Sequence, residues 1–394
     1  MSIASKHQTG FIAALAREVA HYRHQSGDLL LSVFFLLASM IVVAWIFTSG
    51  TLTNLPIAVI DQDGTSVSRA YVRMIEATPE MRVTEYVTSL AAARELIEQA
   101  SIYAAVLIPR NFGKDIRTSK QVTVVGWHSG QFLTISAVIS KSLRQVTATL
   151  SAGIEMTSLA KRGDSALAAQ VNFEPIRPEL RTLFNPFQNY QYFLVAGLLP
   201  AMLQVFVMSW SVFVVGREFR DGTSAAWLTA GTMTYAAVAA KMLPVFIVAS
   251  AIGLGCLGWV HGIVGWPVTG SLGVLIVGWA LMILAYITLG LLAAGFAPTL
   301  ATALSFTAAY TAPAFAYAGI TFPQQGMPLL AELWSYALPV QTLLSLQVEQ
   351  TQIGAPVRSS VSELLILTAF ILLPLPLALR KIRLRCETSV AEHR

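Results

Sequence analysis

A short mixed-charge segment in the middle of the chain has the residue types of a docking site. Arg217-Glu218-Phe219-Arg220-Asp221-Gly222-Thr223 places two bases and two acids between two long apolar segments. Guanidinium and carboxylate groups form charge-assisted hydrogen bonds with partners. Gly222 permits a sharp turn, Thr223 is a candidate N-cap for a helix from Ser224, and Trp227 offers an apolar anchor. The segment predicts a partner-binding loop. The alternative is an ordinary positively charged loop beside a membrane.

No motif in the sequence indicates catalysis or metal binding. The only Gly-Lys pair, Gly113-Lys114, lacks the upstream glycine of a phosphate-binding loop and is followed by an aspartate. His21 and His24 have no further ligands nearby, as a zinc site requires. Asp61-Gln-Asp-Gly resembles the start of a calcium loop, but Val72 stands where the bidentate glutamate belongs, so a turn is the better interpretation. We therefore expect no enzyme activity, and no cofactor or metal bound by this chain.

The distribution of charge shows which elements must position the loop. Only 12% of the 394 residues are charged and 55% are hydrophobic, whereas soluble domains carry about 25% charged residues. Between Lys241 and Glu332 there is no Asp, Glu, Lys or Arg. A membrane-spanning helix needs about 20 apolar residues. We predict six such helices, near residues 29–47, 190–215, 236–260, 272–294, 300–320 and 364–379.

Basic residues close to these segments set the predicted orientation. They gather in the N-terminal segment, after the second helix and in the C-terminal tail. The positive-inside rule therefore places both termini in the cytoplasm. The excess of bases follows the ends of apolar segments and forms no patch for nucleic acid. Lys241 and Glu363 are interpreted as side chains at helix ends that reach toward the membrane surface.

The predicted fold class is an α-helical integral membrane protein with six transmembrane helices and an inserted external α/β domain between helices one and two. Strands alternate with helices in the insertion, starting with a strand at Leu55–Asp61 and ending with a long helix at 131–160. Residues 11–23 are expected to form an amphipathic helix along the inner membrane surface, with Phe11, Leu15, Val19 and Tyr22 on its apolar side. The predicted parts are an N-terminal helix (1–28), the first transmembrane helix (29–48), the external domain (49–187), a five-helix domain (188–380) with a cytoplasmic loop at 216–228, and a basic tail (381–394).

This order of elements resembles the ABC-2-type transporter permeases over nearly the whole chain. Pro56–Asp63 looks like the family's first external strand, and Asn185-Pro186 looks like its motif before the second span. Glu218–Thr223 looks like its cytoplasmic E-x-x-x-G-T loop. The chain departs from the family where Ala196-Gly197 replaces a frequent Pro-Gly, and where Ala225 replaces a common acidic residue.

The resemblance implies a permease whose loop docks in a groove of a separate ATPase. The residues expected to couple the two are Arg217, Glu218, Arg220, Asp221, Gly222, Thr223 and Trp227. ATP and Mg²⁺ would bind the ATPase, present in two copies beside two permease chains that are identical or paralogous. The external domain would meet a periplasmic adaptor or the departing substrate. The location implied is the bacterial inner membrane, with several crossings.

The resemblance also implies short re-entrant helices after the fifth span, where an outer gate would form. The residues expected there are Phe322, Pro323, Leu333, Trp334 and Pro339. The cargo expected of an apolar pathway is a hydrophobic or amphipathic molecule, such as a drug or lipid, exported by alternating access. The alternative function is that of a membrane receptor or scaffold with an external ligand-binding or partner-binding domain.

Overall fold

The chain forms two compact units. The computed structural model describes residues 10–24, 27–48, 50–118, 120–129, 133–161, 189–231, 234–319, 322 and 324–392. The described residues up to Thr48 and from 189 onward make a helical unit, and those from 50 to 161 make an α/β unit. The motif predicted at Asn185-Pro186 lies outside the described residues.

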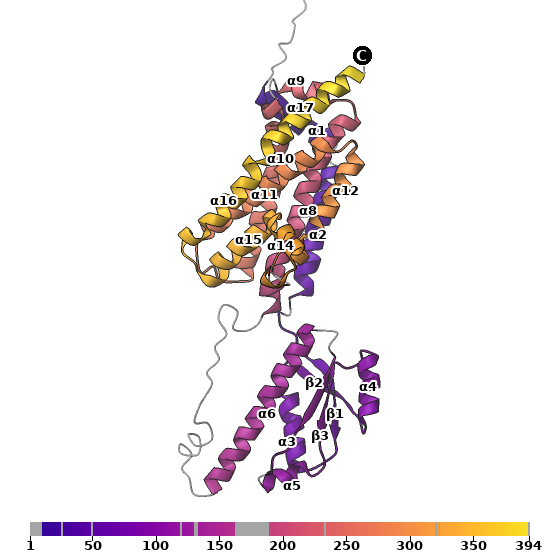
Figure 1. Ribbon diagram of the computed structural model, residues 1–394, viewed down its shortest axis with the longest axis vertical. Coiled ribbons are helices and arrows are strands. Elements are labelled where there is room, and N and C mark those ends of the chain that lie inside the picture. The colour runs from indigo at the N-terminus through magenta and orange to yellow at the C-terminus, as the bar shows by residue number, and fades with distance from the viewer. Residues whose placement is uncertain are drawn as a thin grey trace, which may run out of the picture. The chain divides into compact units, whose positions relative to one another are not determined.

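The α/β unit contains a four-stranded sheet in the order β2-β1-β3-β4 (Figure 1). β1 pairs in parallel with β2 and β3, and β4 pairs with β3 in antiparallel orientation. Buried side chains of α3, α5 and α6 pack on one face of the sheet, and α4 packs on the other. The bounds are β1 (Leu55–Asp61), α3 (Ser66–Glu76), β2 (Met81–Tyr86), α4 (Leu90–Glu98), β3 (Ala104–Ile108), α5 (Phe112–Arg117), β4 (Val125–His128) and α6 (Leu133–Lys161).

The turn after β1 has the local chemistry that its sequence predicts. Oδ1 of Asp61 accepts hydrogen bonds from the backbone N–H groups of Asp63 (2.9 Å) and Gly64 (3.0 Å). The hydroxyl of Thr65 caps α3 by accepting from the N–H of Ser68. The turn interpretation of this motif is confirmed. The short helix α5 was not predicted, because six residues give too little periodicity to detect.

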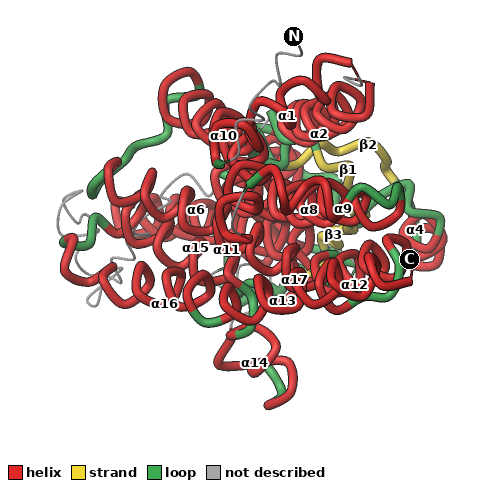
Figure 2. The backbone as a smooth tube through the Cα atoms, turned by 90° about the horizontal axis from the view of Figure 1, so that it is seen from above, coloured by secondary structure: helices red, strands yellow, loops and turns green. Residues whose placement is uncertain are grey.

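The helical unit is built around α11, which packs against α8, α10, α12, α15, α16 and α17 (Figure 2). Its helices are α1 (Phe11–His24), α2 (Gly27–Ile46), α8 (Tyr190–Arg220), α9 (Ser224–Ala230), α10 (Thr234–Leu257), α11 (Leu272–Phe296), α12 (Leu300–Thr311), α13 (Ala314–Tyr317), α14 (Leu329–Tyr336), α15 (Pro339–Val348), α16 (Val361–Leu372) and α17 (Pro374–Glu392). A π-helical turn, Gly258–Ile263, extends α10.

Four helices are long and apolar enough to cross a membrane in the described part of the chain. They cover Gln191–Arg220, Thr234–Ile263, Leu272–Phe296 and Val357–Thr388, and they match the second, third, fourth and sixth predicted spans. The apolar run of α2, Leu30–Ile46, matches the first predicted span but is shorter.

The fifth predicted span is wrong as a single helix over 300–320. α12 ends at Thr311, and the separate short helix α13 begins at Ala314. Pro313 explains the break, because it has no N–H to donate and its ring clashes with the preceding turn. The side-chain amide of Gln204 on α8 donates to the freed carbonyl of Thr311 at 3.4 Å. Twelve residues of α12 span about 18 Å, roughly half of the hydrocarbon core.

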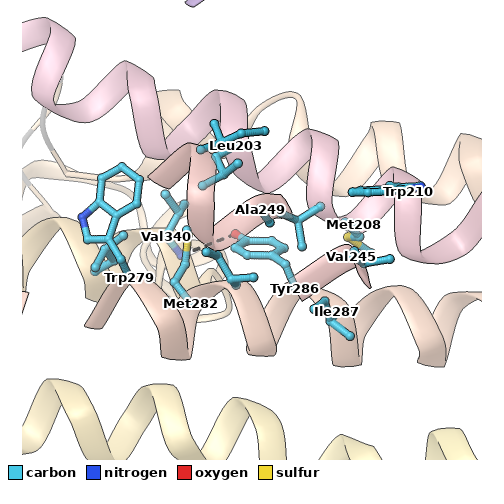
Figure 3. Close-up of a cluster of buried hydrophobic side chains, with 14 of the residues drawn as sticks. Leu203, Met208, Trp210, Val245, Ala249, Trp279, Met282, Tyr286, Ile287 and Val340 are labelled. Carbon is cyan, nitrogen blue, oxygen red and sulfur yellow. Dashed lines mark hydrogen bonds between the residues drawn. The ribbon is translucent and has the colours of Figure 1, made fainter. Parts of the chain in front are cut away.

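A dense apolar core joins α8, α10 and α11. Tyr286 is completely buried at its centre, and the N–H of Val340 donates to its hydroxyl at 3.4 Å (Figure 3). Gly290 lets α11 approach α8 closely, since a Cβ there would lie 2.9 Å from the carbonyl oxygen of Met208. This packing holds the loop after α8 on the core of the helical unit.

Candidate functional site: the mixed-charge loop and its buried ion cluster

The loop between α8 and α9 begins with a Schellman turn. Gly222 has a positive φ of 68°, and the N–H of Thr223 donates to the carbonyl of Glu218 at 2.9 Å. The predicted turn at Gly222 is confirmed. The predicted cap is wrong, because the hydroxyl of Thr223 makes no capping hydrogen bond to α9 and donates to Oε2 of Glu218 at 2.6 Å.

The charged residues of this loop separate into an exposed pair and a buried pair. Arg220 and Asp221 form an ion pair at 2.8 Å, with side chains 56% and 48% exposed. The hydrogen bond from Arg220 lowers the pKa of Asp221, so its carboxylate is ionised. Arg217 and Glu218 are buried instead. Of these two pairs, only Arg220 and Asp221 have side chains that a partner protein could contact.

The buried pair belongs to an ion cluster that joins three helices. Glu18 of α1 pairs with Arg217 of α8 and accepts from Nζ of Lys241 of α10 at 2.5 Å. Nζ of Lys241 also lies 2.8 Å from Oε1 of Glu218. Arg17 completes the cluster by donating to Oε2 of Glu218 at 2.8 Å. These five residues are called the ion cluster below.

The ion cluster has three cations and two anions. The side chains of Lys241, Glu18 and Glu218 are 1%, 3% and 5% exposed. Desolvating charges costs several kcal/mol per ion, and this cost is offset only when the charges are paired and hydrogen-bonded. Each acid therefore holds two cations. The cluster fixes the first helix against the helices that flank the exposed loop.

The interpretation of Lys241 as a side chain reaching the membrane surface is wrong. It is buried, and its ammonium lies 5.2 Å from the ring centroid of Trp227. Sequence reasoning also missed Glu18. The signal was present, because Glu18 is the only acidic residue before Asp28 and lies on the same helix as Arg17.

Trp227 does not have the exposed position expected of a partner-binding anchor. It is 1% exposed, and its indole N–H donates to the carbonyl of Ala237 at 3.2 Å. It therefore packs α9 onto α10 inside this chain. Its position makes Trp227 a support for the loop.

One side of α1 packs against the protein, and part of its predicted apolar side stays exposed. Ala14 and Glu18 are buried, whereas Phe11 and Val19 are 40% and 41% exposed. Glu18 lies on the inward side because it pairs with Arg217 and Lys241. The exposed Phe11 and Val19 belong to the side that the sequence predicts to lie along the membrane surface. Tyr22 lies one turn further along, with its ring 5.5 Å from the guanidinium of Arg217.

The second predicted region, after the fifth span, contains two short helices. On α14, Leu333 and Trp334 are 57% and 38% exposed, and Phe322 before it is 51% exposed. Pro339 is buried at the start of α15. Pro323 lies outside the described residues. Tyr310 of α12 connects to this region, because its hydroxyl donates to the carbonyl of Ala337 at 2.5 Å.

An apolar cavity of about 470 Å³ lies between α8, α11 and α12. Its lining is almost wholly aliphatic and aromatic, and Thr302 and Tyr310 supply its side-chain hydroxyls. The lining residues are Met208, Leu289, Leu292, Ala293, Phe296, Ala297, Pro298, Thr302, Phe306 and Tyr310. A cavity of this size and composition fits a small hydrophobic ligand.

Comparisons with known proteins agree on one family. The profile described as "ABC-2 family transporter protein" matches residues 28–380. The chain is also similar to the "Probable multidrug ABC transporter permease YbhS" of Escherichia coli strain K12 and of E. coli O157:H7. Each is 27% identical over 180 residues, covering 44% of this chain and 46% of the relative. The matched region thus spans about half the length of these curated relatives.

Proposed function

This chain belongs to the ABC-2 family of transporter proteins, whose profile covers most of its length, and on this premise we propose that it exports hydrophobic or amphipathic molecules. Permeases of this family hydrolyse no ATP, so the family implies an ATPase partner. The finer elements of the proposal are the cargo, the direction of transport, the assembly and the membrane topology.

The observation that carries the cargo proposal is the apolar cavity between α8, α11 and α12. Leu289, Phe296 and Phe306 offer it apolar surface, and the hydroxyl of Tyr310 adds one polar group at its wall. Apolar burial drives ligand binding in such a cavity, whereas a charged solute would lose its hydration there without compensation. The name of the curated relatives, which describes a probable multidrug permease, is consistent with this class of cargo.

The proposed topology has six crossings with both termini in the cytoplasm of a bacterial inner-membrane protein. The four long helices supply four crossings, α2 supplies the first, and α12 with α13 supplies the fifth. The break after Thr311 is compatible with this because the side-chain amide of Gln204 donates to the buried carbonyl of Thr311. The α/β unit would then lie outside, where an adaptor protein or the released cargo would meet it.

The proposed energy transfer begins at the exposed pair Arg220 and Asp221. An ATPase that binds this pair would push on the Gly222 turn when it closes on ATP. The ion cluster directly behind the turn would carry that displacement to α1 and α10, because Arg217 and Glu218 are bonded to both. Two permease chains, identical or paralogous, would alternate between inward-open and outward-open states with two ATPase subunits.

Reconstitution tests this function directly. The full-length chain and its ATPase subunit would be placed in liposomes, and ATP-dependent movement of a hydrophobic fluorescent amine would be followed. We expect the dye to cross only with ATP and to stimulate ATP hydrolysis. Movement of a charged, membrane-impermeant dye with no transport of the hydrophobic one would contradict the proposed cargo.

A further inference from the structure

A second hollow lies between α9, α10 and α17. Its volume is about 680 Å³. Its lining combines two guanidinium groups and one carboxylate with a phenol, two threonine hydroxyls and two leucine side chains. The lining residues used below are Leu228, Tyr235, Leu379, Arg380, Arg383 and Glu387. This hollow is called the basic groove.

The basic groove lies where two helices change from apolar to polar. α17 runs through apolar residues as far as Leu379 and becomes basic at Arg380. α10 begins at Thr234 and presents Tyr235, 61% exposed, at the same groove. Tyrosine is typical of the layer in which lipid headgroups meet the hydrocarbon region. In a membrane, this composition would place the groove at the depth of the lipid headgroups.

The four cations of α17 have two different environments. Lys381 lies 4.6 Å from the ring centroid of Phe296, and Arg385 donates to the carbonyls of Ala294 (2.6 Å) and Pro298 (2.8 Å). These two side chains are used in packing against α11. Arg380 and Arg383 point instead to the groove.

The groove cations are only partly neutralised by the described residues of the chain. Arg383 pairs with Glu387 at 2.9 Å in an exposed pair, which contributes little. Within the described part of the chain, Arg380 has no carboxylate within ion-pair distance. Two cations and one anion leave the groove with a net positive charge beside apolar Leu228 and Leu379.

We propose that the basic groove binds the phosphate group of an anionic phospholipid from the adjacent leaflet. Arg380 and Arg383 would hold the phosphate by charge-assisted hydrogen bonds, and Tyr235 would donate from its hydroxyl. The acyl chains would follow Leu379 and Leu228 toward the membrane. Basic pockets between the cytoplasmic ends of membrane helices are suited to such headgroups. The inference rests on the membrane location, but not on the proposed cargo or direction.

Lipid binding to the purified full-length protein tests the proposal independently of transport. The protein in detergent would be titrated with phosphatidylglycerol, with phosphatidylcholine and with inorganic phosphate, and bound lipid would be counted by native mass spectrometry. We expect retained phosphatidylglycerol that neither of the other two displaces at equal concentration. The variant R380Q/R383Q should bind it about 25-fold more weakly, since each basic side chain near a membrane contributes about fivefold.

The control variant is Lys381→Gln, which removes one positive charge from the same helix, on the face toward Phe296. It should leave lipid binding within about twofold of the wild type, and all variants should keep the wild-type unfolding temperature. If Lys381→Gln weakens lipid binding as much as R380Q/R383Q does, the lipid is held by the overall positive charge of α17 and the groove proposal is overturned. If inorganic phosphate displaces the bound phosphatidylglycerol, the groove is a site for free anions and the lipid proposal is overturned. If R380Q/R383Q binds lipid as the wild type does but no longer binds the ATPase subunit, the groove contacts the ATPase and the lipid proposal is overturned.

Discussion

Nζ of Lys241 lies 2.5 Å from Oε2 of Glu18, across 223 positions of sequence and with both side chains almost completely buried. This contact joins the N-terminal helix to the start of α10 at the base of the mixed-charge loop. Neither residue has an exposed surface through which it could contact a partner. Their contact therefore holds α1 against α10 beside the loop, so α1 helps to fix the position of the loop.

Removing the carboxylate of Glu18 should destabilise the protein strongly. Glu18→Gln leaves three cations of the ion cluster against the single acid Glu218. Breaking a buried ion pair from one side typically costs about 3–5 kcal/mol. We expect a clearly lower unfolding temperature of the full-length protein in detergent. Arg23→Gln, at the exposed end of the same helix, should change it little, and equal shifts in both variants would argue against the cluster.

Removing a cation together with the acid should restore part of this stability. Glu18→Gln combined with Lys241→Met leaves two cations facing one acid, a smaller imbalance than Glu18→Gln alone. We expect the double variant to lose less than the sum of the two single losses, by about 1 kcal/mol or more. Additive losses in the same unfolding measurement would mean that the two side chains do not interact.

The docking of α1 should depend on pH through His21. Burial lowers the pKa of His21 below 6.5, and the nearby Arg217 lowers it further. The neutral ring is therefore favoured in the folded protein. Its contribution to stability is present above pH 6.5 and is lost as the pH falls through the lowered pKa of the folded state. We expect the unfolding temperature to decrease between pH 7 and pH 5.5.

Two substitutions separate His21 from the other titrating groups. His21→Gln should reduce this pH dependence, whereas His24→Gln on the exposed end of α1 should not. The acids Glu18 and Glu218 face the same side and act in the opposite direction on His21. If the unfolding temperature of both glutamine variants depends on pH as that of the wild type does, groups other than His21 cause the pH dependence.

Some elements follow from local sequence and others depend on contacts across the chain. The strands around Leu55–Asp61 and the turn at Gly222 were predicted correctly because alternation and backbone freedom are local signals. The fifth helix was predicted too long, because the apolar pattern continues past the break caused by Pro313. The burial of Lys241 could not be predicted, since its ammonium pairs with Glu18, 223 positions away. The burial of Trp227 depends on how α9 packs against α10, which local sequence does not show.

Filling the apolar cavity should reduce transport without unfolding the protein. Leu289→Trp adds an indole at the cavity wall, and Leu272→Trp places the same ring at an exposed position on α11. We expect ATP-dependent dye movement to fall at least about 10-fold in the first variant, since size changes in a hydrophobic pocket have effects of this order. The second should transport normally. Unchanged transport by Leu289→Trp would place the pathway elsewhere.

The exposed position of Asp221 gives the most direct test that this permease is driven through its mixed-charge loop. A tagged full-length chain would be purified in mild detergent as the wild type, as Asp221→Arg and as Glu98→Arg, a matched change on an exposed helix of the α/β unit. Vanadate-sensitive ATP hydrolysis in each eluate would be measured. We predict that the wild type and Glu98→Arg bring down an active ATPase, and that Asp221→Arg loses about 90% or more of it, as loss of 1.4 kcal/mol or more of binding energy requires. A wild-type protein that brings down no ATPase, or an Asp221→Arg variant that retains it fully, would contradict this account.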